Sequence, residues 1–309
     1  RINYVMEHGN FGFKDEMTGA YWPSERVNME DSIPLRHWHL NDPGVVPNLL
    51  QTGSGSPTGI LIYEGSLLPP QFHNQMIHSE PGHNVVRSYP VKKNGAGYTA
   101  EIINILNNDR DQWFRPADVC IAPDGSLIVA DWYDPGVGGH QAGDQQRGRI
   151  YRVAPEGAAY KVPKYDYSTP SGAVEALQNP NLAVRRRAWL ALRAMGGEAV
   201  PALEKLWQTS DDPRMRARAL WVLLKMPGGE KYIEQASNDN LPEMRIIALR
   251  AARQGKKDVI GLVSKLSSDS SNTTCSGAEI APMPSMSIPA PPACSSAGVV
   301  SARLPKLGA

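Results

Sequence analysis

Residues 116–131 read PADVCIAPDGSLIVAD, and this stretch decides the fold of the N-terminal half of the chain. Two apolar runs, residues 118–122 and 127–131, flank the turn sequence PDGS at residues 123–126. The Asp-Gly pair supplies the positive φ angle that a tight hairpin turn needs. The pattern therefore predicts two antiparallel strands, and the sequence RIYRV at residues 149–153 is typical of a third strand.

A similar order of strands occurs once more upstream. The two sets open at Pro57 and Pro116, which lie 59 positions apart. Repeated strand sets are typical of propeller blades, whereas a β-sandwich would give the strands without the repeated order. We therefore expect residues 1–155 to form a partial β-propeller, its last blades, with long loops and short strands over residues 1–55. The upstream strands are predicted by three short apolar or alternating runs, at residues 58–63, 75–78 and 85–91.

A linker at residues 156–170 separates this part from a helical one, because the apolar period then changes from two residues to 3.6. A second amphipathic stretch, residues 199–207, completes one helix pair. The pattern predicts a HEAT-like α-solenoid at residues 171–268, so the fold class is multidomain β plus α. Three similar segments carry this prediction, at spacings of 31 and 29 residues, each after a proline that predicts a helix start: VRRRAWL at 184–190 after Pro180, MRARALW at 215–221 after Pro213, and MRIIALR at 244–250 after Pro242.

The composition breaks at Asp269. Ser, Pro, Ala and Met dominate residues 269–309 without any periodicity, which predicts a disordered tail. The abrupt change leaves a second interpretation open, in which this tail is a frameshifted reading of the gene.

Composition excludes several classes of protein. The 309 residues carry a formal net charge of +1, so the whole chain is not an obvious binder of polyanions. Its three cysteines form no CxxC or CxxCH pair, which argues against a zinc knuckle or an attached c-type haem in this chain. No run approaches the roughly 18 apolar residues that a transmembrane helix needs. The first residue is Arg1 and no leader precedes it, so we expect an internal fragment of a longer protein.

Three stretches resemble a family of planctomycete-type membrane-bound dehydrogenase-like proteins: residues 113–153, 37–50 and 56–68. The resemblance implies a sugar or sorbosone dehydrogenase propeller, then HEAT repeats, then a cytochrome domain with haem c. It implies a periplasmic or membrane-associated protein that oxidises a sugar or alcohol and passes electrons to that cytochrome domain. The chain has no CxxCH and lacks most blades, so the fragment is expected to be inactive alone.

The resemblance also implies pyrroloquinoline quinone and Ca²⁺ as cofactors. Arg115 matches the position of one cofactor-binding arginine, and Arg binds carboxylates in a fork. The companion position is Ala117, and the expected lysine is not evident near residues 79–82. The alternative is that Arg115 is a structural residue on the central face of the propeller.

Candidate metal ligands and one candidate catalytic residue follow the hairpin. Asp131, Asp134 and Asp144 offer the hard oxygen ligands that Ca²⁺ prefers, although their spacing does not fit an EF-hand. The alternative is that these side chains close turns. His140 lies in the same glycine-rich loop and is a candidate general base.

His37 and His39 are the other candidate catalytic residues. In a strand both would point to the same face and share a metal or a substrate with Asp42 nearby. Two histidines on a polar strand face equally need no function. His78 and His83 flank a further loop and are expected to line the same central mouth.

The alternative function is a non-catalytic scaffold that binds a carbohydrate or a protein. The helical part has 16 Lys or Arg against 9 Asp or Glu over residues 179–268, with arginines at recurring positions. We interpret them as solvated helix faces paired with Asp211, Asp212 or Glu243, or else as a basic strip for a protein partner. Nucleic acid is disfavoured, because only Trp189 and Trp221 interleave with the arginines and both are expected in the core.

Overall fold

The computed structural model describes residues 1–5, 8–15, 18–53, 58–95, 97–108, 110–137 and 145–269. The chain divides into two compact units between Pro163 and Lys164, inside the linker expected at residues 156–170. We call them the β unit and the helical unit. The predicted tail lies outside the described residues, apart from Asp269, which ends the last helix.

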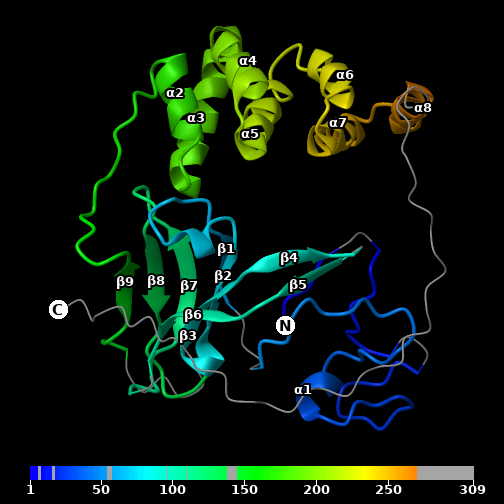
Figure 1. Ribbon diagram of the computed structural model, residues 1–309, viewed down its shortest axis with the longest axis vertical. Coiled ribbons are helices and arrows are strands. Elements are labelled where there is room, and N and C mark those ends of the chain that lie inside the picture. The colour runs from blue at the N-terminus through cyan, green and yellow to red at the C-terminus, as the bar shows by residue number, and fades with distance from the viewer. Residues whose placement is uncertain are drawn as a thin grey trace. The chain divides into compact units, whose positions relative to one another are not determined.

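The β unit contains a four-stranded antiparallel sheet in the order β1-β2-β3-β6. A hairpin, β4 and β5, is inserted between β3 and β6 and projects from this sheet (Figure 1). The strands predicted from residues 58–63, 75–78 and 85–91 are therefore confirmed. The strand bounds are β1 Ile60–Ile62, β2 Met76–Glu80, β3 Val85–Tyr89, β4 Val91–Asn94, β5 Gly97–Ala100 and β6 Ile103–Asn107.

A second antiparallel sheet has the order β7-β8-β9, with β7 Pro116–Ile121, β8 Leu127–Asp131 and β9 Arg149–Val153. It confirms the hairpin predicted around the PDGS turn. Gly125 has φ +89°, a conformation that glycine adopts without steric cost. Over the described residues the two sheets remain open and do not close into a ring. An antiparallel sheet of four strands suits a propeller blade, and the blade interpretation stays a prediction.

One apolar core joins the two sheets. Ile77 and Val86 from the first sheet share it with Leu127 from the second, and all three are buried. Tyr63 crosses the core, since its fully buried hydroxyl donates to the carbonyl of Gly125 at 2.7 Å and accepts the N–H of Leu68 at 2.9 Å. The sheets are thus held by burial and by a satisfied polar bridge.

Loops precede the sheets. Among the described residues before β1, the structure has one helical turn, α1 (Ile33–Arg36), and two isolated bridges, Ile2 with Leu50 and Asn10 with Val45. Two 3-10 turns, η1 (Pro70–Phe72) and η2 (Pro81–His83), flank β2. The long loops expected over residues 1–55 agree with this description, whereas the short strands expected there correspond to no strand in the described residues beyond the two isolated bridges.

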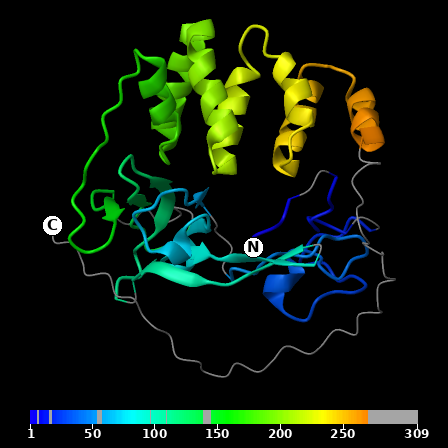
Figure 2. The ribbon, with the colours of Figure 1, turned by 45° about the horizontal axis from the view of Figure 1, so that its top comes forward.

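The helical unit is a row of successive helices (Figure 2). Asn181 caps α3 by accepting the N–H of Val184, and Asp212 caps α5 by accepting that of Arg214. Pro213 and Pro242 begin helices as predicted. The prediction for Pro180 was wrong, because Asn181 caps the helix and Pro180 lies before that cap. The bounds are α2 Pro170–Leu177, α3 Leu182–Met195, η3 Gly196–Ala199, α4 Val200–Thr209, α5 Pro213–Leu223, α6 Lys231–Ser237, α7 Pro242–Gln254 and α8 Val259–Asp269.

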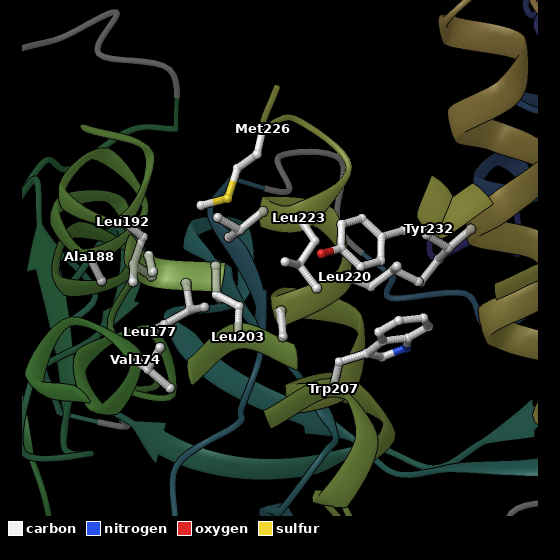
Figure 3. Close-up of a cluster of buried hydrophobic side chains, with 14 of the residues drawn as sticks. Val174, Leu177, Ala188, Leu192, Leu203, Trp207, Leu220, Leu223, Met226 and Tyr232 are labelled. Carbon is white, nitrogen blue, oxygen red and sulfur yellow. The ribbon is translucent and has the colours of Figure 1, made fainter. Parts of the chain in front are cut away.

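The core of the helical unit runs through consecutive helices. Figure 3 shows Leu192, Leu203, Leu220 and Tyr232, from α3, α4, α5 and α6, in one buried cluster. Each helix gives one apolar stripe to this cluster and leaves its opposite face to solvent, as an amphipathic period requires. None of the helices in the described ranges is long and apolar enough to span a membrane.

Leu203 tests this packing. Leu203 is fully buried, so Leu203→Ala leaves a cavity and should lower the free energy of unfolding by about 2–5 kcal/mol. Urea unfolding followed by circular dichroism at 222 nm measures the loss. Leu190→Ala is the matched control, because Leu190 lies on an exposed face of α3 and its truncation should change stability by less than about 0.5 kcal/mol. Equal losses in the two variants would contradict the assigned core.

Candidate functional site

Arg115 lies at the start of β7 and joins two loops. Its backbone N–H donates to Asp131 Oδ1 at 2.9 Å. Its Nη1 donates to the carbonyl of Pro81 at 3.0 Å, and its Nη2 donates to the carbonyl of Pro135 at 3.1 Å. Burial lowers the pKa of the guanidinium, against the raising effect of Asp134 and Asp131. The side chain therefore stabilises the main chain at the ends of two strands.

Asp131 and Asp134 both bind main-chain amides. Asp131 Oδ1 accepts the N–H groups of Arg115 and Tyr133, each at 2.9 Å. Asp134 Oδ1 accepts the N–H of Gly136 at 2.7 Å. These contacts support the interpretation that the two carboxylates close turns. In the described part of the chain, no three His, Cys, Asp or Glu side chains gather as a metal site.

Two of the predicted residues, His140 and Asp144, lie outside the described residues. Their assignment as a catalytic base and a Ca²⁺ ligand stays a prediction.

The strand expected at His37 and His39 is wrong. His37 follows helix α1, and its ring stacks on Trp22 with centroids 4.1 Å apart. His39 has φ +47°, is fully buried, and contacts Asp42 Oδ2 through Nδ1 at 3.3 Å. Since the segment is a helical turn, a spacing of two residues does not place both rings on one face. The structure separates them.

Pyrroloquinoline quinone does not fit the residues that the resemblance assigned to it. A carboxylate clamp requires the paired N–H donors of a guanidinium, and Arg115 directs its two terminal nitrogens at the carbonyls of Pro81 and Pro135. The companion position is Ala117, which offers no charge. Asp131 and Asp134, two of the three Ca²⁺ ligands proposed nearby, bind main-chain amides instead.

A cluster of buried polar side chains lies on one face of β2 and β3. Strand period two puts His78 and Glu80 on the same face of β2, and the register pairs His78 with Arg87 on β3. Tyr89 joins them, because its hydroxyl lies 2.9 Å from His78 Nδ1. Thr52 covers this face, and its carbonyl accepts Arg87 Nη1 at 3.0 Å. We call these five residues the β2–β3 polar cluster.

The β2–β3 polar cluster carries shifted pKa values. Burial lowers the pKa of His78 to about 4, and the positive charges of the N-terminal amine and of Arg87 act in the same direction. Burial raises the pKa of Glu80, against the opposing charge of Arg87. Burial also raises the pKa of Tyr89 to about 12. His78 is therefore a neutral imidazole at pH 7, and its Nε2 is buried without a hydrogen-bond partner among the described residues.

The helical unit carries an open groove of about 460 Å³. One tryptophan from each of two helices lines the groove, together with arginines. Figure 1 shows these two helices, α3 and α5, as neighbours. The sequence interpretation placed both tryptophans in the core. Both pack against the core of the helical unit, and each is only partly buried. We call this the Arg–Trp groove and define it by Leu182, Arg185, Arg186, Trp189, Arg218 and Trp221.

Sequence reasoning named His78 but missed its companions. Glu80, Arg87 and Tyr89 are ordinary strand residues in the sequence. The available signal was the combination of period two within β2 with an antiparallel partner, which places polar side chains together on a face expected to be buried.

Comparison with known proteins gives two family matches. Residues 22–157 match a family model described as a domain of unknown function, DUF7133. Residues 171–224 match HEAT repeats, which confirms the HEAT-like part of the predicted solenoid. No curated protein matches the chain.

Among solved structures, the chain is similar to an oxidoreductase from Thermus thermophilus that is described as a glucose dehydrogenase. The identity is 18% and the TM-score is 0.26. The match covers 36% of this chain and spans 29% of that chain. A likeness of this extent supports no conclusion about activity.

Arg115→Lys tests the structural role of the guanidinium. An ammonium group cannot reach both carbonyls in a fork, so the variant should lose about 2–4 kcal/mol of local stability. Hydrogen exchange of residues 116–131, measured by mass spectrometry, should report this loss as faster exchange. Arg110→Lys is the control, because Arg110 is exposed and should leave the exchange unchanged. Unchanged exchange in Arg115→Lys would contradict the clamp.

His78 gives a pH prediction. Its pKa in the folded state is about 4, against the ordinary 6.5, so the stability it contributes is present above pH 6.5. That stability is lost as the pH falls from 6.5 to 4, up to about 3 kcal/mol. Nuclear magnetic resonance titration of the His78 ring should give the low pKa. Urea unfolding at several pH values should show the acid-side loss.

Two variants separate His78 from other titrating groups. His78→Asn should remove this part of the acid-side loss, whereas Tyr89→Phe keeps the imidazole and should keep the loss. A His78 ring that titrates near 6.5 would contradict its assigned burial.

Proposed function

We propose that this chain is a binding scaffold, in which a β unit resembling a sugar dehydrogenase propeller is joined to a HEAT-type array that recognises a protein partner. One observation carries the proposal. Arg115, expected to hold the carboxylates of a quinone, donates instead to the carbonyls of Pro81 and Pro135. Both terminal nitrogens of the residue expected to bind the cofactor therefore bind main-chain carbonyls.

The helical unit supports the binding role. Its Arg–Trp groove is open and exposes Leu182 (73%) beside two partly buried tryptophans. Contiguous exposed apolar residues mark interaction surfaces, and stacked repeats provide extended faces for partners.

A sugar or alcohol dehydrogenase is the second candidate function, and the β2–β3 polar cluster favours it. A neutral imidazole can exchange a proton with a substrate hydroxyl. Glu80 is fully buried on the same face of β2 as His78, and burial raises the pKa of its carboxyl group. With this second function we also propose a periplasmic or membrane-associated location and the transfer of electrons to a cytochrome c domain.

A cofactor-retention assay separates the two functions. The purified chain is incubated with pyrroloquinoline quinone and Ca²⁺, passed through gel filtration, and assayed for dye reduction with aldoses and alcohols. We expect no retained quinone and no substrate-dependent reduction, because the terminal nitrogens of Arg115 bind carbonyls and Ala117 offers no side-chain donor. A soluble quinoprotein glucose dehydrogenase serves as the positive control.

Two histidine variants complete the assay. Substrate-dependent reduction that falls at least tenfold in His78→Asn, but not in His73→Asn, would establish the dehydrogenase and overturn the scaffold. His73 is the matched control because its ring contacts the carbonyl of Leu68 at 2.7 Å, outside the polar cluster.

A further inference from the structure

We infer that the Arg–Trp groove binds an acidic peptide segment of a partner protein, anchored by one apolar side chain. This inference deepens the proposed scaffold function and rests on it. It commits to the chemistry of the partner, which neither the HEAT match nor the domain match assigns.

The groove has an apolar bed. Leu182, at the first turn of α3, is 73% exposed, and Trp189 and Trp221 are partly buried beside it. Isolated exposed apolar residues are ordinary, but three that share one groove of about 460 Å³ form a seat for an apolar side chain.

The groove is bordered by positive charge. Arg186 is exposed and lies 5.9 Å over the Trp189 ring, and Arg193 lies 4.7 Å over the same ring. Arg218 is held in place, since its Nη1 donates to the carbonyls that end helix α2, those of Leu177 and Gln178. Among the described residues, no acidic side chain lines the groove. Charge complementarity therefore favours an anionic partner.

The basic character is local, and this selects a short acidic peptide over a nucleic acid. The arginines of α5 beyond the groove already have carboxylate partners: Arg214 pairs with Asp212 at 2.7 Å, and Arg216 pairs with Asp239 at 2.6 Å. A nucleic-acid backbone needs a basic track that continues along several repeats. Here the track is neutralised within α5, just beyond the groove, whereas an acidic motif around one anchor residue fits the groove alone.

The test uses the full chain and a fluorescein-labelled nine-residue peptide. The peptide has a Leu-Phe centre flanked by glutamates, and binding is followed by fluorescence anisotropy. Two matched peptides isolate the determinants: one replaces the flanking glutamates with lysines, and the other replaces the Leu-Phe centre with alanines. A twelve-nucleotide oligo-dT is the nucleic-acid probe.

We expect the acidic apolar peptide to bind, and both altered peptides to bind at least tenfold more weakly. Affinity should fall as salt is raised, because the charges are exposed. Arg186→Glu should weaken binding about tenfold, and Leu182→Ala about threefold or more. Arg250→Glu is the control, because Arg250 is an exposed arginine of α7 outside the groove, and it should change affinity less than twofold.

Three results would overturn the inference. The first is no binding of the acidic peptide, and the second is binding that Arg186→Glu and Leu182→Ala leave unchanged. The third is tighter binding of oligo-dT with the same sensitivity to Arg186→Glu, which would assign the groove to nucleic acid. Circular dichroism at 222 nm checks that every variant is folded. These results are independent of dye reduction, so a failed groove and a failed scaffold proposal are distinguishable.

Discussion

The side chain of Arg115 is the constraint on which the β unit depends. It donates to a carbonyl in η2, the turn between β2 and β3, and to another carbonyl beyond β8. Asn84 strengthens the same seam, because its Nδ2 donates to the carbonyls of Gln112 and Phe114. Buried carbonyls must find donors, and these two side chains supply them where the sheets meet. The residue that looked most like a cofactor ligand is therefore a structural tie.

The local elements of this fold can be predicted from the sequence, but the long-range hydrogen bonds that connect them cannot. The hairpin around Gly125 was predictable because period two and an Asp-Gly turn act within a few residues. The bond from Arg115 to Pro81 spans 34 positions, and no local pattern indicates it. His37 and His39 show the opposite failure. A spacing of two residues suggested a strand, but Pro34 favours the start of a helical turn and prevails.

The same limit applies to the candidate sites. Each strand of the β2–β3 polar cluster is ordinary alone, and only the pairing of β2 with β3 brings His78 to Arg87. In the helical unit, the period of 3.6 predicted the helices that carry Trp189 and Trp221. It could not show that both rings are only partly covered, since that depends on how the neighbouring helices pack. The helical period determines which residues share a face of a helix, but the packing of the neighbouring helices determines how exposed that face is.

The arginines of the three similar segments make different contacts in the described part of the array. Arg216 donates to the carbonyl of Trp207 near the end of α4, and Arg245 donates to the carbonyls of Asp239 and Asn240 after α6. Both tie one helix to the end of the helix before it. Asp239 also neutralises Arg216. Of the expected partners Asp211, Asp212 and Glu243, Asp212 pairs with Arg214. Arg185, the equivalent arginine of the first segment, lines the Arg–Trp groove instead, and the next residue, Arg186, lies exposed over Trp189. The recurring arginines are thus largely used to link successive helices. The arginines that remain for recognition lie together on α3 and α5.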